Sequence, residues 1–133
     1  MLDDFWKDLE EGWAWGSLSI RRSRGTYYPP VNIYETDDKY IVLMELPGIN
    51  PDLIKLEYES GHLKIRGKRI DPVCDENTKY HALEIHFGEF ERIIKFGGDI
   101  EPDGIRTVYS NGFLRVELPK KKKKVITLEI EEE

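Results

Sequence analysis

The sequence lacks the features that several large classes of protein require. It has a single cysteine, Cys74, so no disulfide can form within the chain, and a reducing compartment is the default expectation. No apolar run approaches the roughly 20 residues of a transmembrane helix. The acidic start of the chain also lacks the apolar segment of a secretory signal. These absences predict a soluble cytoplasmic protein that does not act at a membrane.

Positive charge is also in short supply. The chain of 133 residues has 20 lysines and arginines against 26 acids, a net charge of −6. An excess of negative charge repels phosphate, which argues against general nucleic-acid binding. The distribution is uneven, because the first eleven residues hold five acids and one lysine, whereas residues 120–124 are five consecutive lysines.

Signatures of catalysis and cofactor binding are missing. The glycines at 97, 98 and 104 lack the lysine pattern of a phosphate-binding loop. No Ser-His-Asp or Cys-His arrangement stands out. The residues best suited to bind a metal do not have the spacing of a metal site: His62, Cys74, His81 and His86. We therefore expect neither an enzyme nor a bound cofactor or metal.

Residues 1–28 form a distinct aromatic arm. Apolar residues recur at helical spacing, with acids on the other face, and all three tryptophans of the chain lie here. The apolar set is Leu2, Phe5, Trp6, Leu9, Trp13 and Trp15. Gly12 and Gly16 would end the helix, and residues 17–26 are interpreted as a linker. One alternative is a helix packed on its own domain; a membrane-surface helix is disfavoured because anionic lipids repel its acidic face.

Residues 29–119 have the pattern of an all-β domain. Ile54, Leu56 and Tyr58 alternate with charged residues, as in a half-buried strand. Ser60-Gly61 and Asn111-Gly112 are hairpin turn signals, of which the second is the stronger. Seven or eight short strands at this spacing predict an immunoglobulin-like antiparallel β-sandwich. Residues 69–87 interrupt the pattern as a long loop, in which residues 80–85 could form one more strand.

Residues 120–133 form a separate tail. Its lysine run is interpreted as a solvated spacer rather than a binding patch, because like charges repel. Ile126, Leu128 and Ile130 then alternate with polar residues. An isolated strand is not stable in water, so this peptide needs an edge or groove on a partner. The alternative is that it forms an edge strand of its own domain.

Four motifs in this order resemble the α-crystallin domain of small heat-shock proteins. They are residues 30–34, the Leu-Pro-Gly at 46–48, Gly88-x-Phe90-x-Arg92, and Asn111-Gly112-x-Leu114 followed by Leu118-Pro-Lys. The resemblance covers residues 28–120. Three positions depart from the family pattern: Gly97 replaces a usual proline, Thr107 a frequent alanine, and Phe113 a small branched residue.

The resemblance implies an ATP-independent holdase chaperone that binds unfolding client proteins through the aromatic arm. It implies a homodimer, assembling into larger homo-oligomers, in which a strand of the long loop is swapped onto a neighbouring subunit. The candidate swapped strand is Tyr80, His81, Ala82 and Leu83. Arg92 would have a structural role, pairing with carboxylates at a subunit interface.

In the same family an I-x-I motif docks in a groove between two strands of another subunit. Here the motif is either Ile126-x-Leu128 or Leu128-x-Ile130, and the sequence does not choose between the two. The alternative function is that of a related CS-type co-chaperone, a monomeric adaptor without a swapped loop or a docking tail.

Overall fold

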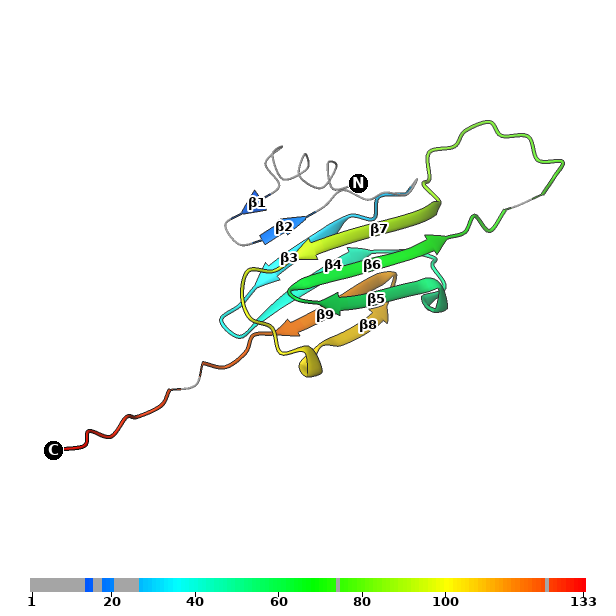
Figure 1. Cartoon of the computed structure of the whole chain (residues 1–133). Coiled ribbons are helices and arrows are strands. Elements are labelled where there is room, and N and C mark those ends of the chain that lie inside the picture. The colour runs from blue at the N-terminus through cyan, green and yellow to red at the C-terminus, as the bar shows by residue number, and fades with distance from the viewer. Residues whose placement is uncertain (1–13, 16–17, 21–26, 74, 124) are drawn as a thin grey trace.

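The computed structural model of the chain describes residues 14–15, 18–20, 27–73, 75–123 and 125–133. Within them, nine strands form two antiparallel sheets, and helix is limited to two short 3-10 turns. The expected antiparallel β-sandwich is therefore confirmed. Figure 1 shows the two sheets stacked face to face, with the long loop and the C-terminal tail leaving at opposite ends.

The first sheet has the order β1-β2-β7-β6-β5. Its strands are β1 (Ala14–Trp15), β2 (Leu18–Ile20), β7 (Gly88–Lys95), β6 (His62–Arg69) and β5 (Ile54–Glu59). The residues 17–26 were expected to be a linker, and this expectation is wrong for Leu18–Ile20. A three-residue strand is too short to show a period in the sequence, and its pairing with β7 is a tertiary contact.

The second sheet has the order β3-β4-β9-β8. Its strands are β3 (Val31–Glu35), β4 (Lys39–Glu45), β9 (Phe113–Pro119) and β8 (Arg106–Ser110). The two 3-10 turns are η1 (Pro51–Leu53) and η2 (Pro102–Gly104). Asn50 caps η1, since its side chain accepts a hydrogen bond from the Asp52 amide at 3.0 Å.

Both expected hairpin turns are present. Ser60 and Gly61 have φ of 48° and 82°, and Asn111 and Gly112 have φ of 52° and 82°. Positive φ at both central residues is characteristic of the type I′ turn, whose twist matches the right-handed twist of the two strands that it joins. The turn at 111–112 joins β8 to β9, and it sets the register in which Ser110 lies opposite Phe113.

The core lies between the sheets and follows from the alternation along each strand. Side chains of successive strand residues point to opposite faces, so every second residue is buried. On β4 these are Tyr40, Val42 and Met44, and on β9 they are Leu114, Val116 and Leu118. The first sheet contributes Leu63, Ile65, Phe90 and Ile94.

Candidate assembly and binding surfaces

A buried arginine closes the base of the long loop. Arg69 is the last residue of β6, follows the inward alternation of Leu63 and Ile65, and is only 6% exposed. Its guanidinium donates hydrogen bonds to the backbone oxygens of Pro47, at 3.3 Å, and His86. Arg69 immediately precedes the loop of residues 70–87 and His86 is its last residue but one, so one side chain holds the two ends of the loop together.

The same guanidinium holds the segment that leads into the sandwich. Arg69 donates to the Tyr27 hydroxyl at 3.1 Å, and its guanidinium carbon lies 4.3 Å from the centre of the Tyr27 ring. The ring of Phe87 lies at 4.9 Å. Stacking on aromatic faces stabilises a cation that has left water. Sequence reasoning missed Arg69, although its place on the inward face of β6 was a usable signal.

Tyr27 is itself part of the core. It is 5% exposed, and its ring meets that of Phe90 edge to face, with centroids 5.9 Å apart. Its hydroxyl donates to the Glu45 carbonyl at 3.2 Å. Burial raises the pKa of the Tyr27 phenol, so the group stays neutral. The arm is therefore fixed to the domain from Tyr27 onward.

Arg92 fixes the next residues in a similar way. Its Nη1 donates to the Pro29 carbonyl at 2.9 Å. Burial lowers the pKa of Arg92, but an arginine remains a cation at neutral pH. Its described partner is thus a backbone oxygen of the same chain rather than a carboxylate, and its expected place at a subunit interface stays a prediction.

The loop itself exposes apolar side chains. Tyr80 and Leu83 are 59% and 69% exposed, and Ile85 is 70% exposed. No described residue between Arg69 and Gly88 belongs to a strand, so the possible strand at 80–85 does not form within one chain. A strand needs a partner edge for its backbone hydrogen bonds, and the loop projects beyond the sheets (Figure 1). The swapped role of Tyr80, His81, Ala82 and Leu83 stays a prediction.

The C-terminal tail leaves the domain at a defined point. The Lys120 amide donates to the Asp38 carbonyl at 2.8 Å, and the Lys121 amide donates to the Asp99 carbonyl at 2.9 Å. The Lys120 ammonium lies 2.9 Å from Glu35 Oε2 and 5.1 Å from the centre of the Tyr40 ring. Lys120 is thus part of the domain, and the expected spacer begins after Lys121.

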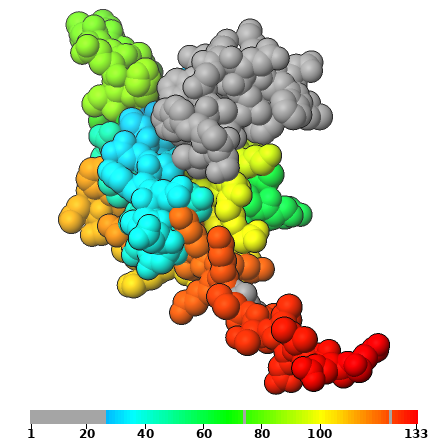
Figure 2. Space-filling model, turned by 90° about the vertical axis from the view of Figure 1, so that its left-hand side faces the viewer, coloured from blue at the N-terminus to red at the C-terminus, as the bar shows by residue number. Residues whose placement is uncertain are grey.

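Beyond that point the tail is extended and exposed. Ile126, Leu128 and Ile130 are 73%, 83% and 93% exposed. The described tail residues, 121–123 and 125–133, form no strand, so an edge strand of the tail's own domain is not observed. Figure 2 shows the tail (red) standing away from the body of the molecule, at the end opposite the loop (light green).

Two edge strands present apolar side chains that are only partly covered. Among the described strands, β5 ends the first sheet and β8 ends the second. Figure 1 draws both along the lower margin of the sandwich. Several of their side chains and one neighbour pack against the core but remain half-buried: Ile54, Leu56, Tyr58, Ile105 and Tyr109. Val108 on β8 is 41% exposed.

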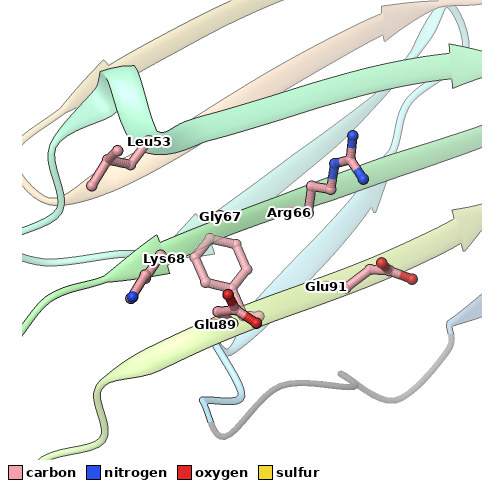
Figure 3. Close-up of a pocket in the computed structure, with 7 residues that line it drawn as sticks. Leu53, Arg66, Gly67, Lys68, Glu89 and Glu91 are labelled. Atoms are coloured by element: carbon pink, nitrogen blue, oxygen red, sulfur yellow. The ribbon is translucent and has the colours of Figure 1, made fainter.

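The outer face of the first sheet is charged, with both signs interleaved. On β6, Lys64 lies opposite Glu57 of β5 and Arg66 lies opposite Glu91 of β7, and Arg66 is also 3.4 Å from Glu57. A hollow of about 400 Å³ at this face is drawn in Figure 3. It is lined by Leu53, Arg66, Gly67, Lys68, Glu89, Phe90 and Glu91. Its balanced charges favour no particular ion, and no metal-binding group of His, Cys, Asp and Glu occurs among the described residues.

The outer face of the second sheet carries a shared carboxylate. Glu117 Oε1 lies 2.9 Å from the Arg115 guanidinium and 3.3 Å from the Lys39 ammonium. Hydrogen bonds from Arg115 and Lys39 lower the pKa of Glu117. The contacts tie β4 to β9.

Most of the aromatic arm lies outside the described residues. This applies to Leu2, Phe5, Trp6, Leu9 and Trp13, and of Trp15 only its place in β1 is described.

No helix in the described part of the chain has the length and apolar content to cross a membrane.

A family model described as "Hsp20/alpha crystallin family" matches residues 32–131. "Small heat shock protein C2" of Rickettsia felis is 36% identical over 93 residues, which are 70% of this chain and 60% of that protein. The "18 kDa heat shock protein" of Clostridium acetobutylicum is 40% identical over 95 residues, 70% of this chain and 62% of that protein. The chain thus matches about three fifths of the length of both relatives.

Solved structures agree with these matches. "Heat shock protein 16.0" from Schizosaccharomyces pombe has a TM-score of 0.65 at 32% identity, covering 76% of this chain and 97% of that one. A small heat-shock protein from Xylella fastidiosa, described as having "a distinct high order structure", has a TM-score of 0.70 at 25% identity. That likeness covers 80% of this chain and 99% of the other.

Proposed function

Because the chain belongs to the Hsp20/alpha crystallin family, we propose that it is an ATP-independent holdase that binds partly unfolded proteins and prevents their aggregation. The observation that carries the proposal is the apolar surface of the loop and tail. Leu83, Leu128 and Ile130 are 69%, 83% and 93% exposed. Side chains of this kind, gathered in two projecting segments, mark surfaces for other polypeptides.

The working form in this proposal is an oligomer built from dimers. Residues 80–83 add as a strand to an edge of a partner subunit, which supplies the hydrogen-bond partners that the loop lacks within one chain. Arg69 supports this step, because it fixes both ends of the loop and so limits the positions that the loop can take.

The tail links dimers into larger assemblies. Ile126, Leu128 and Ile130 dock between the edge strands β5 and β8 of another subunit, where half-buried apolar side chains remain to be covered. Burying apolar surface contributes roughly 25 cal/mol per Å². Client proteins are held mainly by the aromatic arm, whose tryptophans can cover surfaces of many shapes.

The function is tested by light scattering of a heat-aggregating client with purified protein and no ATP. We expect suppression at an equimolar ratio of subunit to client. Unchanged aggregation at and above that ratio would refute the holdase. The native mass measured at the same time distinguishes an oligomeric holdase from a monomeric adaptor. A protein that stays strictly monomeric at micromolar concentration would behave as a CS-type adaptor does.

Tail docking has a matched test. The triple variant Ile126→Ala, Leu128→Ala, Ile130→Ala should reduce the native mass to that of a dimer. The double variant Thr127→Ala, Glu129→Ala changes the alternate side of the same peptide and should keep the parent mass. If both variants keep the parent mass, the docking idea fails even where holdase activity stands.

A further inference from the structure

The C-terminal tail carries its two kinds of charge at opposite ends. Residues 121–123 are lysines and residues 131–133 are glutamates. The apolar alternation of Ile126, Leu128 and Ile130 lies between them. A second copy of the tail that runs in the opposite direction therefore places its acids beside these lysines and its apolar residues beside the apolar residues. In this sense the tail is complementary to itself.

The tail also has the exposure that such a contact needs. Among the described residues, the last backbone hydrogen bond is that of the Lys121 amide, and no later described residue belongs to a strand. Val125, Leu128 and Ile130 are 93%, 83% and 93% exposed. Figure 1 shows the segment extending clear of both sheets. Its backbone is therefore open to another strand, as that of an edge strand is.

The charges determine the direction of the pairing. In a parallel, in-register pair each lysine would lie opposite a lysine and each glutamate opposite a glutamate, and like charges directly opposite each other are destabilising. In an antiparallel pair the lysines of residues 121–123 in one copy lie opposite the glutamates of residues 131–133 in the other. Opposite charges at such positions are stabilising, and the two-fold symmetry makes every pair occur twice.

The alternation of side chains limits the register. A slip of one residue turns the apolar residues of the two copies to opposite faces. Among the registers that avoid this, the one centred on Thr127 places each lysine of residues 121–123 opposite a glutamate. It also places Ile126 opposite Leu128 on one face. At the centre, Thr127 lies opposite Thr127 of the other copy, which is a favourable cross-strand pair.

We propose that the tail pairs with the tail of a second copy of this chain, in an antiparallel ladder whose two-fold axis lies at Thr127. The inference goes beyond the proposed function, because it requires neither a client nor a docking groove. The ladder and the proposed docking use the same apolar side chains, so one tail can do only one of the two at a time. A two-stranded ribbon is marginally stable in water, so the pair forms and releases.

Disulfide trapping tests the ladder at its axis. In a Cys74→Ser background, Thr127→Cys places two thiols on residues directly opposite each other, with Cα atoms about 4.5–5.5 Å apart, within the range of a disulfide. Glu129→Cys is the matched control on the same face of the tail. Its two copies lie four residues apart along the ladder, or roughly 13 Å, which is too far for a disulfide. The measurement is the rate at which covalent dimers form in oxidised glutathione.

We expect the Thr127→Cys variant to form covalent dimers at least about tenfold faster than the Glu129→Cys variant, because only its thiols come within disulfide range. This difference should shrink in about 1 M salt, where the Debye length is about 3 Å. Equal rates for the two variants at low salt would overturn the proposal.

Charge reversal separates the ladder from docking in a groove. One variant reverses the three lysines: Lys121→Glu, Lys122→Glu and Lys123→Glu. A second variant reverses the three acids: Glu131→Lys, Glu132→Lys and Glu133→Lys. Lys120, which belongs to the domain, and Lys124, which lies outside the described residues, stay unchanged in both.

Either reversal alone should lower the Thr127→Cys rate to that of the control, since like charges then lie opposite each other. Combining both reversals in one chain, or mixing the two variants, should restore the rate. Docking between β5 and β8 does not predict this rescue, because the domain is the same in every variant. Trapping that persists in a single reversal, or that the combined reversal does not restore, refutes the ladder and leaves tail docking and holdase activity standing.

Discussion

Replacing Arg69 with methionine should destabilise the domain and loosen the base of the long loop. Methionine keeps much of the length of the side chain but cannot donate to Pro47, His86 or Tyr27. A hydrogen bond from a charged donor contributes about 1.5–3 kcal/mol, and a buried acceptor left unpaired costs about 1–3 kcal/mol. Two of the acceptors, the Pro47 and His86 carbonyl oxygens, are only partly buried, and the buried Nε of Arg69 has no hydrogen-bond partner among the described residues. We therefore expect a net loss of about 2–4 kcal/mol.

The measurement is chemical and thermal unfolding at equal subunit concentration, since assembly contributes to apparent stability. A loss of this size lowers the Tm by roughly 10–25 °C in a domain of this length. Tryptic cleavage at Lys79 should also become faster, because the two ends of the loop are no longer held.

Arg66→Met is the matched control. Arg66 lies on the same strand but faces outward, is 43% exposed as a side chain, and pairs with Glu57 at 3.4 Å. Such a surface pair contributes less than about 1 kcal/mol. If the two variants differ by less than about 0.5 kcal/mol in the free energy of unfolding, Arg69 does not support the loop as described.

Three further predictions concern the sandwich. Gly67→Ala places a Cβ 2.6 Å from the Leu53 carbonyl oxygen, so the backbone must move, and we expect a loss of about 1–3 kcal/mol in urea unfolding; an unchanged midpoint would contradict this. Gly112→Ala puts a side chain at φ of +82° and should cost about 1 kcal/mol, whereas a stabilised variant would show that the turn has another conformation. Because its pKa is lowered in the folded state, Glu117 contributes stability above pH 4.5 that is lost as the pH falls through the lower folded value. The Glu117→Gln variant should therefore show a weaker dependence of the free energy of unfolding on pH in that range. If its free energy of unfolding changes with pH as that of the parent does, the bonds of Glu117 with Lys39 and Arg115 do not stabilise the fold as described.

Much of the sandwich could be predicted because its determinants are local. Alternation along residues 54–58 identifies a strand, and Asn111-Gly112 identifies a turn whose φ values only a few residue types adopt readily. These features depend on neighbours within a few residues of each other.

The remaining features depend on contacts distant in the sequence. Strand β2 forms because β7 offers an edge some 70 residues later, which no local pattern in residues 17–26 reveals. Residues 80–85 have strand-like composition but no edge beside them, so they remain a loop. The role of Arg69 could have been suspected from its inward position on β6, but its acceptors come from three separate segments.

Because the tail leaves the domain at a fixed point, the length of the tail limits the distance between the subunits that it links in the proposed assembly. The last anchor is the Lys121 amide, so five residue steps separate it from Ile126. Fully extended, these span at most roughly 17 Å. Charged linkers extend through self-repulsion, so we expect the run of lysines to favour lengths near that limit. A docking site farther away than this distance cannot be reached without straining the chain, and a closer site leaves the tail slack. The length of the tail therefore limits which arrangements of subunits can form a closed assembly. At the right spacing the tether supplies a local concentration in the millimolar range, which lets individually weak docking contacts hold an assembly together while each can still release.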